Sequence, residues 1–211
     1  MKKKFIDPNI KNKSKTVEDN IQLFMFNGEK LPLPTEIEIS ESGTCNRTCS
    51  FCPRSATNFI DKKEFITNSL HKKLCIELKE LNYKGTIRYS GFVEPMLDKN
   101  IFNLISMVRN YLPESNIEMV TNGDPLNLKR LKKLFISGLN KILISAYDGK
   151  EESNKLEDLC IQANLTEKQY IVRHRYYSEE QDFGITLSNR SGLMADAEFK
   201  KKALKEPLKK A

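Results

Sequence analysis

The sequence predicts an α/β fold built on parallel strands, and two observations support this fold class. Short segments rich in β-branched and aromatic residues alternate with longer segments of helical period along residues 35–189. The alternation repeats at intervals of roughly 25 to 50 residues, as expected for strand and helix units joined by right-handed crossovers. The pattern leaves two architectures open, a doubly wound sheet and a barrel or part-barrel of (β/α) units. Both place the functional site at the carboxyl ends of the strands.

Six strands are predicted from their length and composition. They span residues 35–40, 86–92, 116–122, 141–147, 169–177 and 183–189. The last two leave little room for a helix between them, so the final crossover is the least regular part of the predicted topology.

Four helices are predicted between the strands, because apolar residues recur there every three or four positions. They span residues 68–81, 100–112, 127–138 and 151–165. In the first helix Leu70, Leu74, Leu78 and Leu81 recur at intervals of four, four and three residues and share one face. Gly138 is placed to end the third helix, since glycine readily adopts the left-handed conformation that often follows a helix.

Composition and charge describe a globular chain with one core. The chain has 211 residues, of which 39% are hydrophobic and 30% charged. Residues 1–15 carry six Lys and one Asp, and residues 198–211 carry six Lys and two Glu, which gives +5 and +4. Subtracting this +9 from the net charge of +7 leaves −2 for the body. The basic charge therefore belongs to solvated ends, and no nucleic-acid partner is predicted.

The sequence predicts neither a membrane anchor nor a secretory leader. It contains no run of about twenty apolar residues, and no run of about seven to fifteen follows its basic start. We therefore expect a cytoplasmic protein without a membrane partner. In that compartment thiols stay reduced and are available as metal ligands.

Three closely spaced cysteines carry the strongest functional signal. The segment CNRTCSFC places Cys45, Cys49 and Cys52 after the first predicted strand. A structural zinc site needs four protein ligands and a disulfide needs two thiols, so three thiols indicate a metal site with one position left open. Such a tripod can hold three irons of a [4Fe–4S] cluster and leave the fourth to a non-protein ligand. A zinc site completed by His71 or His174 is the alternative.

This spacing resembles the radical S-adenosylmethionine (SAM) superfamily, in which an aromatic residue usually precedes the third cysteine. Phe51 fills that position and is included among the cofactor-binding residues. The resemblance implies a partial (β/α)6 barrel, similar to a TIM barrel, over residues 34–192. It also implies two cofactors, a [4Fe–4S] cluster on the three cysteines and SAM on the open iron. Residues 1–33 are then a basic tail and lead-in.

The segment SGFVEPML resembles the family element that holds the amino group of SAM at the end of the second strand. In the superfamily this element contains Gly-Glu-Pro. Here Val93 stands where that glycine usually lies, whereas Gly91 lies two residues earlier and Glu94 and Pro95 are intact. An ammonium group needs carboxylate and carbonyl acceptors, so the resemblance implies that Gly91, Glu94 and Pro95 bind SAM.

Further SAM contacts are implied at the ends of later strands. Family members place polar groups there against the ribose and methionine portions of SAM, and Thr121, Asn122 and Ser145 occupy these places. A plain turn is the alternative for Thr121 and Asn122. In the fifth predicted strand, the period of two puts Arg173 and Arg175 on one face, where one of them could bind the carboxylate of SAM. Two arginines on a solvated edge strand are the alternative.

Residues 188–192 resemble an Asn-Arg-Ala-Gly segment found in one branch of the superfamily. That branch carries a cysteine-rich C-terminal extension called SPASM, and the resemblance adds Asn189 to the cofactor-binding residues. No cysteine follows Cys160, so we expect residues 193–211 to be a linker cut before such an extension or the end of a short form. Cys75 and Cys160 lie in predicted helices and are expected to pack in the core.

By this resemblance the protein is a radical SAM enzyme. It would cleave SAM reductively at the cluster and use the 5′-deoxyadenosyl radical to take a hydrogen atom from a peptide, a small molecule or a carbohydrate. A flavodoxin or ferredoxin would supply the electron. The alternative function is a non-catalytic zinc- or iron–sulfur-binding module, the remnant of a larger enzyme.

Overall fold

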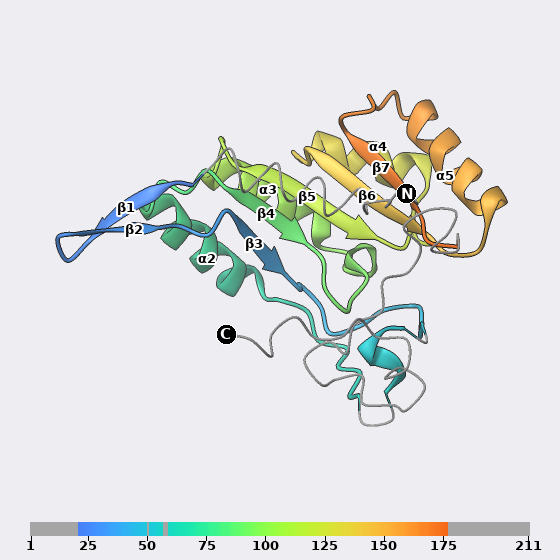
Figure 1. Ribbon diagram of the computed structural model, residues 1–211, viewed down its shortest axis with the longest axis horizontal. Helices are drawn as coiled ribbons and strands as arrows, with labels where there is room; N and C mark the ends of the chain where they lie inside the picture. The colour runs from blue at the N-terminus through green and yellow to red at the C-terminus, as the bar shows by residue number, and fades with distance from the viewer. Residues whose placement is uncertain (1–20, 50, 57–58, 177–211) are drawn as a thin grey trace, which may run out of the picture.

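The computed structural model describes residues 21–49, 51–56 and 59–176, and its centre is a five-stranded parallel sheet (Figure 1). The strands are β3 (Glu36–Ile39), β4 (Thr86–Tyr89), β5 (Asn116–Thr121), β6 (Lys141–Ala146) and β7 (Tyr170–His174). They lie in the order β3-β4-β5-β6-β7, and every neighbouring pair is parallel. A doubly wound sheet reverses its strand order at a switch point, whereas this order never reverses. The α/β part-barrel expected from the sequence is therefore confirmed.

Four α-helices alternate with these strands. They are α2 (Asn68–Glu80), α3 (Ile101–Tyr111), α4 (Leu128–Ile136) and α5 (Lys150–Gln162). Each agrees with a predicted helix to within three residues at either end, and Gly138, with a φ of 112°, follows the end of α4 as expected. Within the described ranges, none of these helices combines the length and apolar character needed to cross a membrane.

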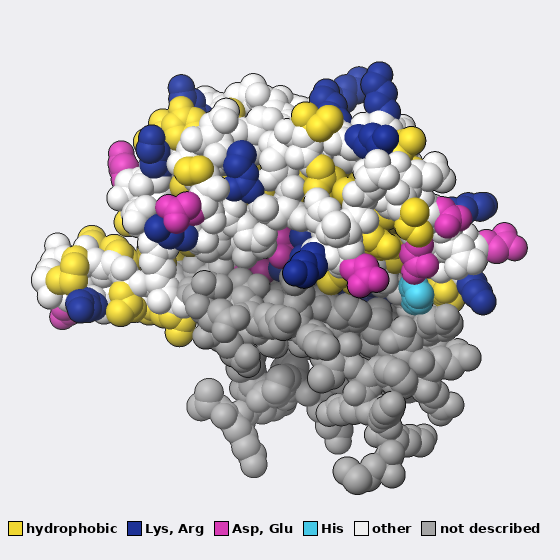
Figure 2. Space-filling view, turned by 90° about the horizontal axis from the view of Figure 1, so that it is seen from above, with side chains coloured by type: hydrophobic (Ala, Val, Ile, Leu, Met, Phe, Trp, Pro, Cys, Tyr) yellow, Lys and Arg dark blue, Asp and Glu magenta, His cyan; other side chains and the backbone are white. Residues whose placement is uncertain are grey.

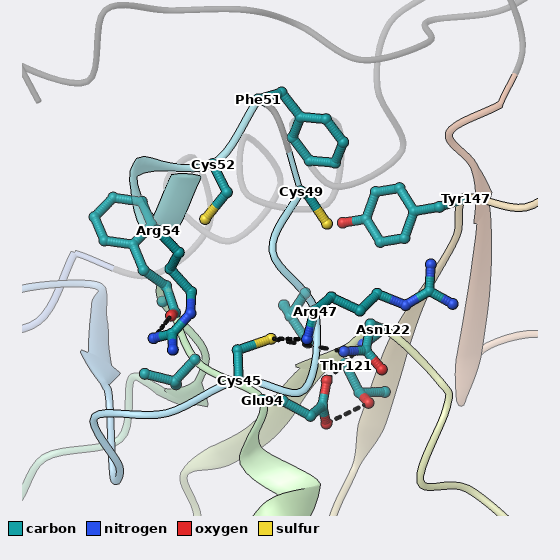
Figure 3. Close-up of a pocket in the computed structure, with 14 residues that line it drawn as sticks. Cys45, Arg47, Cys49, Phe51, Cys52, Arg54, Glu94, Thr121, Asn122 and Tyr147 are labelled. Atoms are coloured by element: carbon teal, nitrogen blue, oxygen red, sulfur yellow. Dashed lines mark hydrogen bonds between the residues drawn. The ribbon is translucent and has the colours of Figure 1, made fainter. Parts of the chain in front are cut away.

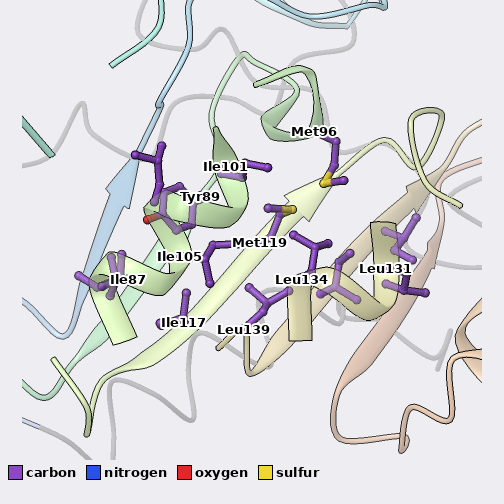
Figure 4. Close-up of a cluster of buried hydrophobic side chains, with 14 of the residues drawn as sticks. Ile87, Tyr89, Met96, Ile101, Ile105, Ile117, Met119, Leu131, Leu134 and Leu139 are labelled. Atoms are coloured by element: carbon purple, nitrogen blue, oxygen red, sulfur yellow. The ribbon is translucent and has the colours of Figure 1, made fainter. Parts of the chain in front are cut away.

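The hydrophobic core lies between the helices and one face of the sheet (Figure 4). Alternate strand residues, such as Ile87, Ile117 and Ile142, point toward the helices and are fully buried. They pack with helix residues that recur at helical spacing, among them Ile105 of α3 and Leu134 of α4. Each fully buried aliphatic side chain contributes about 1.5–3 kcal/mol of transfer free energy. This face holds the four helices on one side of the sheet.

The opposite face of the sheet carries charged side chains in its middle strands. Arg88 of β4 is completely buried, and its Nη2 lies 2.6 Å from Glu36 Oε2 of β3 and 2.7 Å from Glu118 Oε2 of β5. The side chain of Asn116 donates a further hydrogen bond of 2.8 Å to Glu118 Oε1. Because removal of one partner would leave a buried charge, this group strongly favours the observed register of three neighbouring strands.

The leucine face of helix α2 is only partly buried. Leu70 and Leu81 are 51% and 37% exposed. The helix instead buries His71 and Cys75 completely. A histidine can occupy this position because its ring nitrogens find partners inside the core. Cys75, like Cys160 in α5, is the packing residue that the sequence predicted.

An antiparallel hairpin precedes the sheet and was not anticipated in the predicted lead-in. It consists of β1 (Leu23–Phe26) and β2 (Glu29–Pro32), joined by Asn27 and Gly28, both with positive φ. An Asn-Gly pair between apolar segments is a strong hairpin signal, so the sequence did contain the information. The hairpin projects from the body and exposes several apolar side chains, whereas Lys and Arg lie interspersed with Asp and Glu on the face shown in Figure 2.

Three predicted segments fall outside the described residues. They are the sixth strand at 183–189, the Lys-rich segment at 193–211 and the basic start of the chain. The fifth strand was predicted to run to residue 177, whereas β7 ends at His174.

The burial of His71 makes a prediction about acid stability. Its Nε2 lies 2.9 Å from the Tyr89 hydroxyl, and burial lowers its pKa to about 4. The unfolded chain takes up a proton on this ring near pH 6.5, whereas the native protein does so only near its folded pKa of about 4. Stability contributed by neutral His71 is thus fully present above pH 6.5 and is lost as the pH falls from about 6.5 to about 4.

We expect His71→Gln to flatten the pH dependence of unfolding in this window, measured by urea titration of the metal-free protein. Tyr89→Phe is the matched control, because it removes the hydrogen-bonding hydroxyl but keeps the histidine buried and titratable. That variant should lose stability at neutral pH and keep the slope. An unchanged slope in the Gln variant would show that His71 does not titrate differently in the folded and unfolded states.

Candidate functional site

The candidate site is a pocket at the carboxyl edge of the sheet (Figure 3). Loops that follow β3, β4, β5 and β6 all contribute to its lining. Parallel strands in consecutive order end at the same edge, so segments that are far apart in the sequence meet there. Of the predicted site residues, eight line this pocket: Cys45, Cys49, Phe51, Cys52, Gly91, Glu94, Thr121 and Asn122.

The three cysteines belong to one part of the chain, described at residues 44–49 and 51–56, which we call the cysteine loop. The loop is closed at its base, where Gly43 N donates to Glu64 O at 2.9 Å and Ile66 N donates to Glu41 O at 2.7 Å. Inside it, Cys52 N donates to Cys49 O at 2.9 Å, and the short 3-10 helix η1 (Pro53–Ser55) follows. Backbone hydrogen bonds thus fix the curvature that turns the cysteines toward the pocket.

The thiols line one pocket and are all free and partly exposed. In the part of the chain that the structure describes, no three His, Cys, Asp or Glu side chains are gathered closely enough to hold a single metal ion. Thiolates that bind different irons of a cube need not approach one another as closely as ligands of one ion. Burial raises the pKa of the Cys45 and Cys49 thiols, and the charges of Arg54 and Arg47, respectively, oppose the rise.

Glu94 joins the ends of β4 and β5. Its Oε1 accepts hydrogen bonds from Thr121 Oγ1 at 2.6 Å and Met96 N at 3.0 Å, and its Oε2 accepts one from Asn122 N at 2.7 Å. The side chain is 1% exposed, and burial raises its pKa while the hydrogen bonds oppose the rise. Its backbone N also donates to Thr44 O at 3.0 Å, which links the cysteine loop to the same carboxylate.

Gly91, which also lines the pocket, lies too close to Ser40 to carry a side chain. Gly91 has a φ of 131°, and a Cβ at this position would lie 2.1 Å from Ser40 Oγ. Ser40 Oγ is in turn held by a hydrogen bond of 2.8 Å to Ser90 O. Only glycine fits this close approach without strain. Pro95, by contrast, begins the short helix η2 (Pro95–Leu97) as a buried residue and is not part of the pocket lining.

Asn122 connects the end of β5 to the cysteine loop. Its Nδ2 donates to Asn46 Oδ1 at 2.8 Å and lies 3.8 Å from Cys45 Sγ. The next residue, Gly123, has a φ of 85°, and its N donates to Thr121 Oγ1 at 3.1 Å. A SAM contact and a plain turn are therefore compatible interpretations of this segment, because a tight turn places Thr121 and Asn122 at the pocket.

Ser145 and Arg173 lie on the face of the sheet that carries Arg88, which we call the inner face. Neither residue lines the pocket. Arg173 Nη1 donates to Ser145 Oγ at 3.4 Å, and both residues are more than 90% buried. His174 points the other way, because its Nε2 lies 3.0 Å from Glu157 Oε1 of helix α5. Arg175 follows the end of β7 in a turn, and the charges of both arginines act on the Tyr147 hydroxyl. Asn189 lies outside the described residues.

Sequence reasoning missed six residues of the pocket lining, the apolar Phe92, Val93 and Val120 and the three larger polar side chains Arg47, Arg54 and Tyr147. The Tyr147 ring packs against Phe51 with centroids 5.3 Å apart, and Arg47 Cζ lies 5.5 Å from the centroid of the same ring. Tyr147 directly follows β6, so its place after a parallel strand was a usable signal. Nothing in the local sequence distinguished the two arginines from other charged residues of a polar loop.

Fold and site together define a class of protein: an α/β part-barrel with three loop cysteines at its carboxyl edge. Residues 39–181 match the family described as Radical SAM superfamily, which covers more than half of the chain. The chain therefore belongs to the radical SAM superfamily, whose cofactors are SAM and a [4Fe–4S] cluster. Three thiols around one pocket, beside a backbone segment that only glycine fits, suit this pair of cofactors.

Named relatives agree with this family. The chain is 31% identical over 158 residues to the S-adenosyl-L-methionine-dependent 2-deoxy-scyllo-inosamine dehydrogenase of Niallia circulans, a match over 75% of this chain and 60% of the relative. It is 31% identical over 123 residues to the GTP 3′,8-cyclase of Staphylococcus haemolyticus, over 56% of this chain and 35% of that relative.

A solved structure described as BtrN in complex with AdoMet and 2-DOIA has the same fold. It is 27% identical, superimposes with a TM-score of 0.62, and is matched over 77% of this chain and 62% of its own. The chain thus spans about three fifths of the dehydrogenase and of this structure. Membership of the SPASM-containing branch stays a prediction.

The hydrogen bond from Thr121 to the buried Glu94 carboxylate gives a stability prediction. Thr121→Val keeps the side-chain shape but removes both the donor to Glu94 and the acceptor for Gly123 N. We expect a loss of at least about 1.5–3 kcal/mol in the free energy of unfolding, the usual range for the bond to the charged group alone. Urea unfolding of the metal-free protein measures this loss. Thr166→Val is the matched control, because that exposed hydroxyl donates to the neutral side chain of Gln169. Equal losses in the two variants would contradict a special role for Glu94.

Proposed function

We propose that this chain is the catalytic core of a radical SAM enzyme, with the cluster on Cys45, Cys49 and Cys52. The observation that carries the proposal is that all three thiols line the same pocket as Glu94 and Asn122 at the carboxyl edge of the strands. When bound, the cluster supplies one electron for the cleavage of SAM into methionine and a 5′-deoxyadenosyl radical, which abstracts hydrogen from substrate. The protein contributes binding, orientation and exclusion of water.

The pocket offers a distinct partner for each part of SAM. Glu94 uses three lone-pair positions for protein donors, and a carboxylate has about four, so it can still accept a hydrogen bond from the SAM ammonium. Gly91, which lines the same pocket, would bind the same end of the ligand through its backbone. Arg173 and Arg175 carry positive charge at the end of β7 beside Tyr147, where the SAM carboxylate would be stabilised.

The remaining predicted residues have subsidiary roles in this proposal. Ser145 holds Arg173, Thr121 holds Glu94, and Pro95 rigidifies the backbone that follows Glu94. Phe51, with its ring against Tyr147, covers one side of the pocket and excludes water. Asn189 stays a proposed ligand from the sequence alone.

The substrate class we propose is a small hydroxylated molecule. It is supported by the named dehydrogenase, which by its name acts on 2-deoxy-scyllo-inosamine and matches 75% of this chain. A peptide substrate is the alternative. The proposal also includes an external one-electron reductant of the flavodoxin or ferredoxin type and a reducing cytoplasm, in which the three thiols would stay free to bind iron.

The geometry gives little support to the zinc-module alternative. The sequence contains two histidines, and neither lines the cysteine pocket. His71 is in the core beside Tyr89, and His174 pairs with Glu157. A Cys3His site would therefore require one of these elements to leave its packed position.

Cysteine replacements test the cluster assignment. Each of Cys45→Ala, Cys49→Ala and Cys52→Ala should abolish stable iron binding after anaerobic reconstitution, because two thiolates cannot retain a cube whose other irons lack protein ligands. Cys75→Ala and Cys160→Ala are controls in the core and should keep the wild-type iron content. Iron and sulfide analysis gives the readout, and stoichiometric zinc without iron in the wild-type protein would refute the proposal.

Glu94→Gln tests SAM binding separately from the cluster. Loss of the charge-assisted hydrogen bond, worth about 1.5–3 kcal/mol, should weaken SAM binding roughly ten- to a hundredfold at unchanged iron content. Deoxyadenosine formation should then fall at subsaturating SAM. Thr121→Val loosens the same carboxylate without removing its charge and should weaken SAM binding less. Equal affinities of wild type and the Gln variant would leave Glu94 as a structural link between β4 and β5 only.

A further inference from the structure

Arg47 ties the cysteine loop to two other loops of the carboxyl edge. Its Nε donates to Asp124 Oδ2 at 2.7 Å and its Nη2 bonds to the other oxygen of the same carboxylate. Nη1 and Nη2 donate to the two oxygens of Asp148 at 3.1 and 2.8 Å, and Nη2 also donates to Glu152 Oε1 at 3.1 Å. One guanidinium group therefore makes two bidentate contacts, the strongest geometry available to it.

These contacts span three elements of the fold. Arg47 lies between the first two cysteines, Asp124 follows β5, and Asp148 and Glu152 lie between β6 and the first turn of α5. Asn46 strengthens the attachment, because its Nδ2 donates to Asp124 Oδ2 at 2.7 Å. The Arg47 side chain is 17% exposed, so the group is only partly screened by solvent.

Arg54 connects the other end of the cysteine loop to the segments that follow β3 and β4. It follows Cys52 by two residues, and its Nη1 donates to Gly43 O at 3.2 Å and Phe92 O at 3.1 Å. Its Nη2 lies 2.7 Å from Asp61 Oδ1, and its side chain is 5% exposed. This arginine is thus a buried donor to the backbone on both sides of the loop.

We propose that Arg47 and Arg54 are positioning residues that hold the cysteine loop in its cluster-binding conformation before any metal is bound. An unrestrained loop loses conformational entropy when it closes on a ligand, and this loss opposes binding. Two anchors on opposite sides of the loop order it during folding instead, so that the thiols face the pocket before a ligand binds. The identity of the bound cluster rests on the proposed function, whereas the order of the loop does not.

Hydrogen exchange of the full-length, metal-free chain tests the order of the loop directly. Arg47→Met and Arg54→Met should each lower amide protection in residues 44–56 by about tenfold, which corresponds to about 1.4 kcal/mol. Helices α3 and α4 should keep their protection. Lys84→Met is the matched control, because it removes an exposed ion pair with Glu114, at 2.9 Å, away from the loop. That variant should leave the loop unchanged.

Iron retention in the reconstituted protein is the second readout. Both Met variants should bind iron but release it to a chelator about tenfold faster than wild type or the Lys84 variant. Arg47→Lys keeps the charge but not the planar guanidinium group, so its rate of iron release should fall between those of Arg47→Met and wild type. Raising the salt from about 0.05 to about 0.5 M should accelerate iron release from wild type, and from Arg54→Met by the same factor. Both proteins keep the partly exposed Arg47 anchor, and salt screens that anchor.

Unchanged exchange in residues 44–56 of both Met variants would overturn the proposal, whatever metal the protein holds. Should an arginine variant fail to fold, Asp124→Asn and Asp148→Asn weaken the Arg47 anchor from the partner side, and the same loss of loop protection is expected. Failure of the three cysteine variants to lose iron would refute the cluster assignment instead. Hydrogen exchange and the cysteine replacements therefore test the order of the loop and the cluster assignment independently.

Discussion

Parallel pairing of consecutive strands is the constraint on which this structure depends. Because β3 to β7 run in one direction and in chain order, their carboxyl ends share one edge, and each following loop starts beside its predecessor. Cys45, Glu94 and Asn122 meet there although they are far apart in the sequence. The helices pack on the apolar face of the sheet and form the core with it. The loops at the carboxyl edge are not needed for this core and can carry polar and reactive groups.

Side chains, rather than the sheet alone, determine the shape of this edge. The Glu94 carboxylate accepts hydrogen bonds from the β5 end, and Arg47 and Arg54 hold the cysteine loop from two sides. Each anchor pairs a charged group with donors or acceptors from another loop. Such contacts are strong when partly buried, since desolvated charges without partners would be costly. The loops therefore stabilise one another, and a change in one should alter the position of the next.

Local sequence patterns predicted most of the fold, because strand and helix periodicity depends on near neighbours. They also located the three cysteines and Glu94, whose motif spacing is local. They could not identify the partners of Glu94, because Thr121 and Asn122 lie 27 and 28 residues away and become neighbours only in the folded sheet. They could not predict the burial of His71 for the same reason, because the Tyr89 hydroxyl that meets its ring lies 18 residues later.

The two faces of the sheet explain why polar groups can be concentrated at one edge without destabilising the core. On the inner face, Arg88 is neutralised within the sheet by Glu36 and Glu118, which fixes β3, β4 and β5 against one another from that side. Farther along the strands, the row that pairs Ser145 with Arg173 brings a positive charge toward the carboxyl edge, where the Glu94 carboxylate also lies. Both a negative and a positive group of a ligand would therefore meet an opposite charge at this edge, whereas Arg88 is already neutralised, so the charge distribution favours binding at the end where the cysteine loop lies.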